Sequence, residues 1–349
     1  MGVIPKKIPI DYEIIPLTGA RKLVGVDKSN DTLYISNGMK LERSIDFGNT
    51  FSTVYRFTSR VDRFEMLDDG AFLVGLNGGR VYRYADGVAE NVLTMSAMPL
   101  HGFNVVGNII VVGEYNYPPT KVWLSTDYGK TWKAILELSG ASLDHCHDAV
   151  YDPYEHIIWT CWGDGRPFDT VLFSDDLGTS WQSIEDKYYM RATNIMPLPD
   201  CVLFGTDQYC TLGTYRHDRP REGTSQTVVR PYLDWRGRKD TFAENAVWAM
   251  KPAIVYGPPG KAMAFWGYRM PNTGVIPPVQ IYASDGVMTR PIWSLDSLGG
   301  GVEGNGIIGV FGPTVSGHLF ADLRSTFPDS DGVDCTQHIL KVAWDVLEE

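Results

Sequence analysis

Short apolar runs recur along the whole chain, and turn-forming Gly, Asn, Asp or Pro residues separate them. Between residues 103 and 138 the runs read FNVVG, IIVVGEY, KVWLST and WKAILEL. Between residues 149 and 185 they read AVYDP, HIIWTCW, TVLFSD and SWQSIE. Runs of this length with this punctuation are typical of β-strands. The pattern therefore predicts an all-β chain built from four-stranded units.

Seven such units follow one another, and the first run of each is expected to be its innermost strand. These first runs begin near Lys22, Phe64, Phe103, Ala149, Thr193, Ala246 and Gly306. Seven four-stranded sheets around one axis form a β-propeller. We therefore predict that residues 1–349 form a single propeller domain. A six-bladed ring with residues 230–262 as an inserted loop is the alternative.

The last unit is one strand short, because it offers only GIIGVFG, GHLFADL and HILKVAWDV. The N-terminal segment IPIDYEII has no partner of its own. We predict that this segment adds the missing strand and closes the ring, which removes an open sheet edge.

A motif of the form S-x-D-x-G-x-(S/T)-(W/F) occurs at residues 44–51, 125–132 and 174–181. Decayed copies surround Asp86 and Ser284-Asp285. In such a turn the Asp accepts hydrogen bonds from backbone amides, the Gly adopts a positive φ, and the aromatic ring packs back between strands. We assign a structural role to these residues: Asp46, Gly48, Asp127, Gly129, Trp132, Asp176, Gly178 and Trp181.

These motifs resemble the Asp-box or BNR repeats of the family that includes the sialidases. The resemblance implies a propeller and leaves the activity open, because function resides in sites rather than in folds. The phrase HCHDAVYDPYEHIIW, followed by GDG, is also similar to the propellers of bacteriophage tail and host-adsorption proteins.

The net charge of −11 argues against partners that are nucleic acids or anionic membrane surfaces. No apolar run approaches the roughly 18 residues that span a bilayer, so we expect no membrane insertion. The start MGVIPKKIPIDYEII lacks the apolar core of a signal peptide, and we expect synthesis in the cytosol. Five scattered cysteines predict buried free thiols rather than disulfides or a zinc ribbon.

One polar residue precedes each innermost strand, and together these residues are expected to surround the axis. They are Arg21, Arg63, His101, His147, Arg191, Asn245 and Asn305. Such side chains either satisfy backbone groups around a channel or bind an anionic or polyhydroxylated ligand.

Loops between second and third strands reach the same face and carry aromatic, acidic and basic residues, a combination that suits glycans. These residues are Glu114, Tyr115, Tyr117, Asp164, Arg166, Asp207, Gln208, Tyr268 and Arg269. The predicted ligand-binding residues are His101, Tyr115, His147, Trp162, Asp164, Arg166, Arg191 and Asp207.

His145 and His147 alternate onto one side of a strand start, which is a spacing suited to a metal ion. Asp164 or Asp148 is the candidate third ligand. Hydrogen bonding of the two imidazoles to backbone or carboxylate groups is the alternative. No other cofactor is expected.

The sequence lacks the Arg-Ile-Pro string of the sialidases, and VIPKKIP and VYRFTSR do not match it. Another glycosidase would need two carboxylates flanking the scissile bond. Glu114, Asp164, Asp207 and Glu303 are available, but the sequence does not pair them.

We therefore favour a non-catalytic recognition or assembly module of a phage virion, assembled in the host cytoplasm. Its expected partners are a cell-surface glycan and neighbouring tail proteins, and further copies of the chain are an option. A glycoside hydrolase acting on a cell-surface polysaccharide is the alternative.

Overall fold

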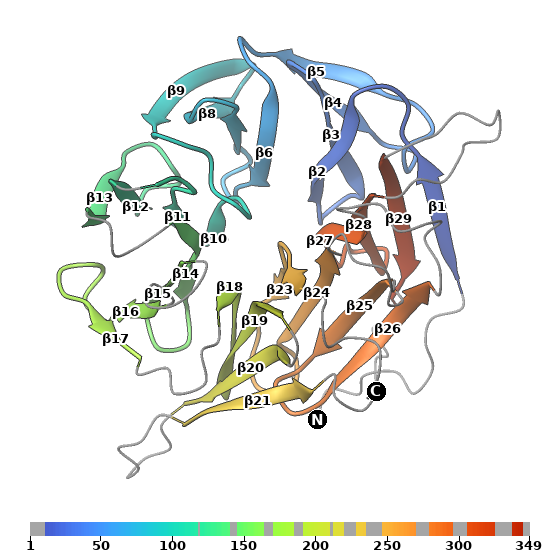
Figure 1. The fold of residues 1–349 in the computed structure, drawn as a ribbon. Coiled ribbons are helices and arrows are strands. Elements are labelled where there is room, and N and C mark those ends of the chain that lie inside the picture. Colours follow the sequence, from blue (N-terminus) through green and yellow to red (C-terminus); the bar gives the residue numbers. More distant parts are fainter. Residues whose placement is uncertain are drawn as a thin grey trace.

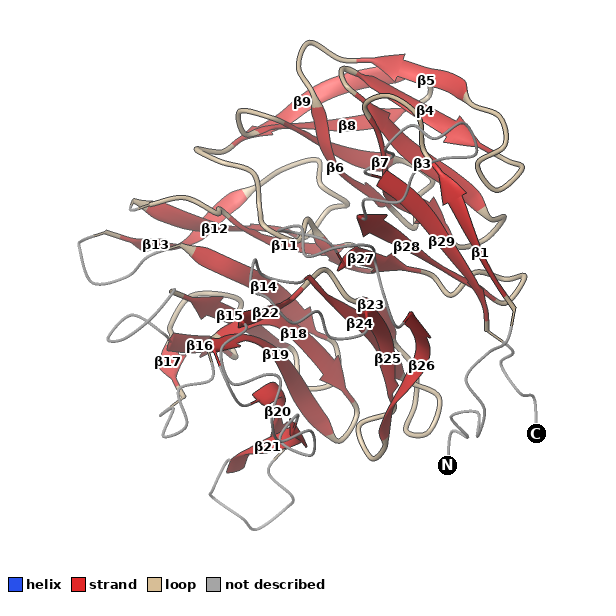
Figure 2. Ribbon diagram, turned by 45° about the vertical axis from the view of Figure 1, so that its right-hand side comes forward, coloured by secondary structure: helices blue, strands red, loops and turns tan. Residues whose placement is uncertain are grey.

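A computed structural model describes most of the chain. The described residues are 11–117, 119–139, 145–163, 170–184, 191–209, 212–219, 228–234, 246–269, 279–295, 306–324 and 337–344. Regular structure in these ranges is β-strand throughout (Figure 2). Within them, no helix has the length and apolar character that a membrane span requires.

Blades one to four are separate four-stranded antiparallel sheets, with strands in chain order from the axis outward (Figure 1). Blade one consists of β2 (Arg21–Asp27), β3 (Thr32–Asn37), β4 (Lys40–Ser44) and β5 (Ser52–Arg56). Blade two consists of β6 (Val61–Met66), β7 (Phe72–Leu76), β8 (Arg80–Ala85) and β9 (Val88–Thr94). Blade three consists of β10 (Asn104–Val106), β11 (Ile109–Gly113), β12 (Thr120–Ser125) and β13 (Lys133–Leu138). Blade four consists of β14 (Cys146–Asp152), β15 (Ile157–Trp162), β16 (Thr170–Ser174) and β17 (Gln182–Ser183).

Blades five to seven complete the ring and share hydrogen bonds along their inner strands. Blade five consists of β18 (Ala192–Leu198), β19 (Cys201–Tyr209), β20 (Leu212–Asp218) and β21 (Val228–Asp234). Blade six consists of β23 (Ala253–Val255), β24 (Met263–Arg269), β25 (Val279–Ser284) and β26 (Thr289–Leu295). Blade seven consists of β27 (Gly306–Phe311), β28 (His318–Arg324), β29 (Gln337–Ala343) and β1 (Tyr12–Pro16).

The prediction of seven four-stranded blades is confirmed, and the six-bladed alternative is wrong. Residues 230–262 contain strands of blades five and six rather than an inserted loop. One strand start needs correction. The strand at Ala246, β22 (Ala246–Ala249), bridges β19 and β24, whereas the innermost strand of blade six is β23.

The N-terminal strand closes blade seven, as the sequence predicted. β1 pairs antiparallel with β29, from Tyr12 opposite Val342 to Pro16 opposite His338. Figure 1 shows β1 beside β29. The outermost strand of the last blade therefore comes from the start of the chain.

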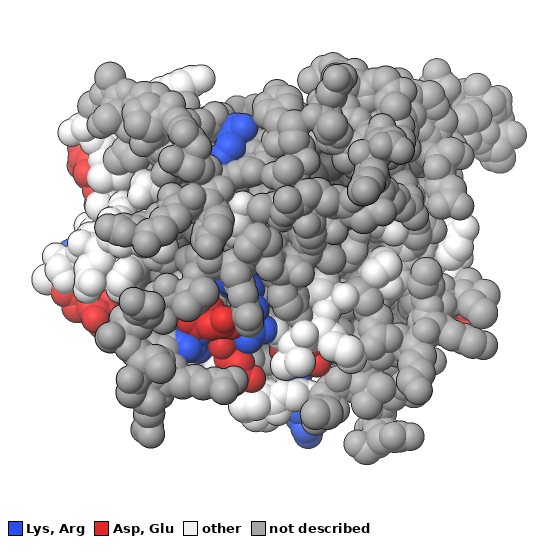
Figure 3. Space-filling view, turned by 60° about the horizontal axis from the view of Figure 1, so that its bottom comes forward, with Lys and Arg blue, Asp and Glu red and all other residues white. Residues whose placement is uncertain are grey.

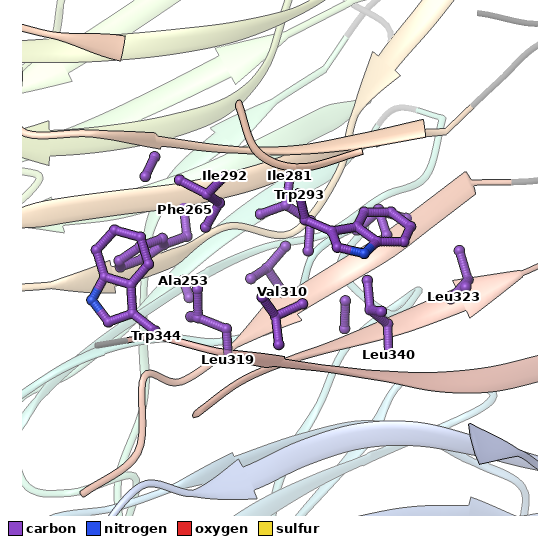
Figure 4. Close-up of a cluster of buried hydrophobic side chains, with 14 residues drawn as sticks. Ala253, Phe265, Ile281, Ile292, Trp293, Val310, Leu319, Leu323, Leu340 and Trp344 are labelled. Atoms are coloured by element: carbon purple, nitrogen blue, oxygen red, sulfur yellow. The ribbon is translucent and has the colours of Figure 1, made fainter. Parts of the chain in front are cut away.

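Apolar clusters fill the spaces between neighbouring blades. Figure 4 shows one cluster between blades six and seven, in which Phe265 and Trp293 face Leu319 and Leu340. Burying each large apolar side chain contributes roughly 1.5–3 kcal/mol. In the described ranges no strand of one of the first four sheets pairs with a strand of another, so these apolar contacts are a main link between those blades.

Close approach of the blades depends on small residues near the axis. A Cβ atom at Gly113 in β11 would lie 2.3 Å from the Sγ atom of Cys146 in β14. Cys146, Cys161 and Cys201 are free and buried, as expected, whereas Cys210 and Cys335 lie outside the described residues.

Candidate functional site

The three Ser-x-Asp-x-Gly turns join third to fourth strands and share one hydrogen-bond pattern. In blade three, Ser125 Oγ donates to Asp127 Oδ1 at 2.8 Å and accepts from the Gly129 amide at 2.9 Å. The Asp127 carboxylate also accepts from the amide and hydroxyl of Thr131. Asp46 and Asp176 make the same contacts in blades one and four. These carboxylates are occupied by their own turns.

Hydrogen bonds also stabilise the ionised form of these aspartates. The Thr50 hydroxyl and amide lower the pKa of Asp46 to about 2. The Ser180 amide and hydroxyl do the same for Asp176. A carboxylate that accepts several N–H and O–H bonds keeps its charge down to low pH.

The turn glycines face the preceding blade. Gly178 has a φ of 86°, and a Cβ atom there would lie 2.5 Å from Cβ of Ile135 in blade three. The indole N–H of Trp181 donates to the carbonyl of Ile135, and that of Trp132 donates to the carbonyl of Gly129. The turn motif thus fixes the contact between adjacent blades.

The decayed copies retain parts of this geometry. Asp86 and Gly87 both have positive φ in the β8–β9 turn. In blade six, Ser284 Oγ accepts from the Gly286 amide, and Asp285 accepts from the Met288 amide.

The opposite face carries two kinds of segment, because neighbouring strands are antiparallel. These are the segments that lead into the innermost strands and the loops between second and third strands. There the Tyr115 ring lies 4.1 Å from the His145 ring, between centroids. Tyr117 projects outward and is 72% exposed. On the side of the molecule drawn in Figure 3, basic and acidic side chains lie next to one another.

His145 and His147 are buried, and their Nε2 atoms are 3.0 Å apart. His147 Nδ1 donates to the carbonyl of Ala192 in blade five at 2.8 Å. The structure therefore brings the two imidazoles together, as their spacing indicated.

The described residues contain no group of three metal-ligating side chains. The Asp148 carboxylate instead accepts from the amides of Ala149 and Ile195, which links blade four to blade five. Asp164 lies outside the described residues. Metal binding by His145 and His147 stays a prediction.

Arg63 bonds to the backbone of the segment that joins blades two and three, and His101 bonds to the backbone of blade five. Arg63 donates from Nε to the carbonyl of Pro99 at 3.0 Å and from Nη2 to the carbonyl of Leu100 at 2.7 Å. His101 Nε2 lies 2.6 Å from the carbonyl oxygen of Thr193. These bonds are the ones expected if such residues satisfy backbone groups around a channel.

A pocket of about 540 Å³ opens where the innermost strands begin, and we call it the axial pocket. It lies on the same face as Tyr115 and Tyr117. Six cationic residues line it: Arg21, Lys22, Arg60, Arg63, Lys251 and Arg324.

Carboxylates compensate this charge in part. Arg21 pairs with Glu42, Lys251 pairs with Glu65, and Asp62 is shared by Lys22 and Arg60. Within the described chain, no carboxylate lies within ion-pair distance of Arg63 or Arg324. The pocket therefore holds an excess of positive charge in an acidic protein.

Two buried side chains of the pocket each keep one polar atom without a hydrogen bond in the described structure. These atoms are Oδ1 of Asp322, which is 4% exposed, and Nδ1 of His101, which is 5% exposed. Burial raises the pKa of Asp322 to about 7, although Lys22, Arg324 and Arg63 oppose the shift. Burial lowers the pKa of His101 to about 3. Unpaired buried polar atoms are costly and call for an explanation.

A second pocket of about 90 Å³ lies further along the axis. His101, Lys251 and Phe311 line both pockets and separate them. Because 90 Å³ holds only a few water molecules, the axial pocket is the larger candidate site.

Other predicted site residues have different environments. Trp162 is buried, and its indole N–H donates to Thr160 Oγ1 at 2.7 Å. Arg191 precedes β18 with a φ of 42°. The backbone of Asp207 lies in β19 opposite Trp248. Ligand contacts of these three residues stay predictions. Four further predicted residues lie outside the described structure: Arg166, Asn245, Glu303 and Asn305.

The sequence reading did not predict several charged residues of the axial pocket: Lys22, Arg60, Asp62, Lys251, Asp322 and Arg324. Asp322 did leave a signal, since it interrupts the apolar run GHLFADL. A carboxylate in the middle of a buried strand is unusual unless it is paired or functional.

Comparisons with known proteins define the fold. No protein-family model matches the sequence, and no curated protein matches it. A chain from the crystal structure of the mitotic checkpoint complex aligns with a TM-score of 0.62 and 11% identity, covering 98% of this chain and 97% of that chain. YCF48 from Cyanidioschyzon merolae aligns with a TM-score of 0.59 and 12% identity, covering 95% and 98%. The WD40 β-propeller domain of Doa1 aligns with a TM-score of 0.57 and 10% identity, covering 95% and 96%. The chain is similar to these structures in its seven-bladed propeller fold.

Proposed function

We propose that the protein is a non-catalytic recognition module that binds its ligand at the face carrying the axial pocket. The observation that carries this proposal is the combination, on that face, of a cationic pocket and exposed aromatic rings. Such a surface gives planar contacts to a sugar ring and charged hydrogen bonds to its substituents. A propeller fold is compatible with this role.

Glu114 was a candidate catalytic residue in the sequence, but the hydrogen bonds of its carboxylate favour a structural role. It accepts four hydrogen bonds, from the Ser96 amide and hydroxyl, the Lys121 amide and the Trp123 indole. A catalytic acid or base needs at least one oxygen that is open to the substrate. Glu114 therefore fixes the loop that presents Tyr115 and Tyr117.

The ligand that we propose is a host cell-surface glycan, and the setting is a phage virion to which the protein contributes a tail component. The residues HCHDAVYDPYEHIIW and the exposed aromatic loop motivate this proposal. Contacts with neighbouring tail proteins would use the rest of the surface. Among structures with the same fold, YCF48 has been solved bound to a D1 peptide, so binding of a protein segment is a further option for this fold.

Binding and turnover can be measured in one experiment. The purified protein is applied to an array of bacterial surface glycans, and the same glycans are assayed for released reducing ends. We expect retention of an envelope glycan without release. Tyr117→Ser should weaken retention, whereas Val88→Ser, an exposed site at a third-to-fourth-strand turn on the opposite face, should not. Equal loss in both variants would contradict the proposed binding face.

A glycoside hydrolase is the second candidate, and Asp322 is the observation that favours it. A pKa near 7 in a pocket is what a general acid requires at neutral pH. A hydrolase would release sugar from the array, and Asp322→Asn would abolish that release. Release that survives Asp322→Asn would exclude Asp322 as the acid.

A further inference from the structure

We infer that the axial pocket is a binding site for one acidic sugar unit, in which the cations hold the sugar carboxylate and Asp322 accepts a hydrogen bond from a sugar hydroxyl. This inference rests on the proposed recognition of a glycan and names the class of unit that is recognised. A uronic acid such as glucuronate has both groups on a single ring.

The charge of the pocket selects for an anion. Three of the five N–H groups of Arg63 donate to the carbonyls of Asp62, Pro99 and Leu100. These bonds fix the guanidinium plane, and no carboxylate of the described residues lies within ion-pair distance of it, although Asp62 and Asp322 are near enough to interact with its charge. The Arg324 side chain makes no hydrogen bond or ion pair with the described residues, so its guanidinium can bind a carboxylate through two parallel bonds.

The unpaired buried atoms select for a hydroxylated ligand. Asp322 Oδ1 accepts no hydrogen bond in the described chain, although Asp322 is nearly inaccessible to solvent. His101 Nε2 faces a carbonyl oxygen, so Nε2 carries the proton and the unpaired Nδ1 atom is a second acceptor. A carboxylate group supplies no donor to these acceptors, whereas a sugar hydroxyl does.

Lys22, Arg63 and Arg324 act electrostatically on Asp322, which places the unpaired acceptor among the cations. The ligand therefore needs a negative group and a hydroxyl donor close to each other. A volume of about 540 Å³ lies in the range of small-molecule sites. One sugar ring with its substituents fits this size, and the exposed Tyr117 lies at the same face for the rest of the chain.

Titration calorimetry with the full chain tests the inference, using glucuronate, glucose and acetate as probes. We expect glucuronate to bind more tightly than either probe, since only glucuronate uses both parts of the pocket. Arg324→Gln should weaken glucuronate about tenfold or more, which corresponds to 1.4 kcal/mol. Arg80→Gln removes an exposed arginine of blade two and should leave the affinity unchanged.

Asp322→Leu separates the two parts of the proposed site. It removes the hydroxyl acceptor together with a negative charge, so glucuronate should weaken while acetate binds as before or more tightly. Circular-dichroism melting checks that each variant folds. If Arg324→Gln does not fold, Lys22→Gln replaces it as the variant that lacks a cation. Equal affinity for glucose and glucuronate, or a glucuronate-to-acetate ratio unchanged by Asp322→Leu, would overturn the inference.

Failure of this site and failure of the proposed function have different signatures. If no glucuronate binds but Tyr117→Ser still reduces retention on the glycan array, the acidic-sugar site is wrong and recognition stands. If no array glycan is retained at all, the proposed function is wrong. Retention that is lost in Arg324→Gln and competed by free glucuronate would support both.

Discussion

Lys251 Nζ lies 2.7 Å from Glu65 Oε2, and this ion pair joins blade six to blade two across the axis of the ring. The two residues are 186 positions apart in the chain. Both side chains are partly buried, at 18% and 27% exposure. Because Lys251 also separates the axial pocket from the second, smaller pocket, the ion pair links the stability of the ring to the shape of the site.

Lys251→Met should destabilise the fold by about 2 kcal/mol, because it leaves the Glu65 carboxylate partly buried without a charged donor. Urea unfolding followed by tryptophan fluorescence measures the change. Glu137→Gln is the matched control, since Glu137 and Lys121 form a more exposed pair at 3.5 Å, which should contribute less than about 0.5 kcal/mol. A similar loss in both variants would show that the cross-ring pair has no special role.

Gly178→Ala should destabilise the fold more than Gly87→Ala. Both glycines have positive φ, 86° and 82°, so alanine is strained at either position. A Cβ atom at Gly178 would collide with Ile135, whereas one at Gly87 meets no atom within 4 Å. We expect a cost of about 1 kcal/mol at Gly87 and about 3 kcal/mol or more at Gly178. Equal unfolding midpoints for the two variants would contradict the inter-blade role of the turn.

Asp176→Asn should lower the melting temperature more at neutral pH than at pH 2. The pKa of Asp176 is lowered in the folded state to about 2, so its contribution to stability is present above its unfolded pKa. That contribution is lost as the pH falls from about 4 through about 2. Asp175→Asn is the neighbouring control at an exposed position. A loss of stability in Asp176→Asn that is constant between pH 6 and pH 2 would disprove the charge-dependent role.

Asp322→Asn should stabilise the protein more at pH 8 than at pH 4. The folded pKa of about 7 lies above the unfolded value near 3.8, so the folded state holds a proton that the unfolded state has released. Wild-type stability from this residue therefore declines between pH 4 and pH 7, by about 4 kcal/mol at 1.4 kcal/mol per pKa unit.

The difference between Asp322→Asn and the wild type is the quantity to measure, because other groups titrate in the same window. The low pKa of His101 acts in the opposite direction, since protonation of the unfolded state reduces stability below about pH 6.5. Guanidinium unfolding at several pH values gives the difference. A value independent of pH would show that Asp322 is ionised throughout.

The blade pattern was predictable because its signals are local. The hydrogen bonds of the turn around Asp127 all lie within seven residues, Ser125 to Thr131. The local amino-acid sequence therefore determines the conformation of this turn. The role of the strand that begins at Ala246 was not predictable in the same way. This strand is defined by pairing with β19 and β24, and such contacts leave no periodic trace in the segment itself.

The axial pocket was only partly predictable for the same physical reason. Arg21, Arg63 and His101 were identified because each was expected to precede an innermost strand, and all three line the pocket, although Arg21 begins β2 and Arg63 lies within β6. Lys251 and Asp322 were missed because their importance depends on blades that meet only in three dimensions. His147, predicted alongside them, is instead bonded to the backbone of blade five.

The strand pairing of Tyr12 with Val342 sets the order in which the molecule can be completed during synthesis. Inner blades can pair their own hairpins as soon as they leave the ribosome. The first strand must stay unpaired until its partner β29 (Gln337–Ala343) has been translated, at the other end of the described chain. Joining segments so distant in sequence carries the largest loop-closure entropy in the fold. The ring can therefore close only after β29 has been translated, and until then β1 leaves an unsatisfied strand edge that can pair with other chains.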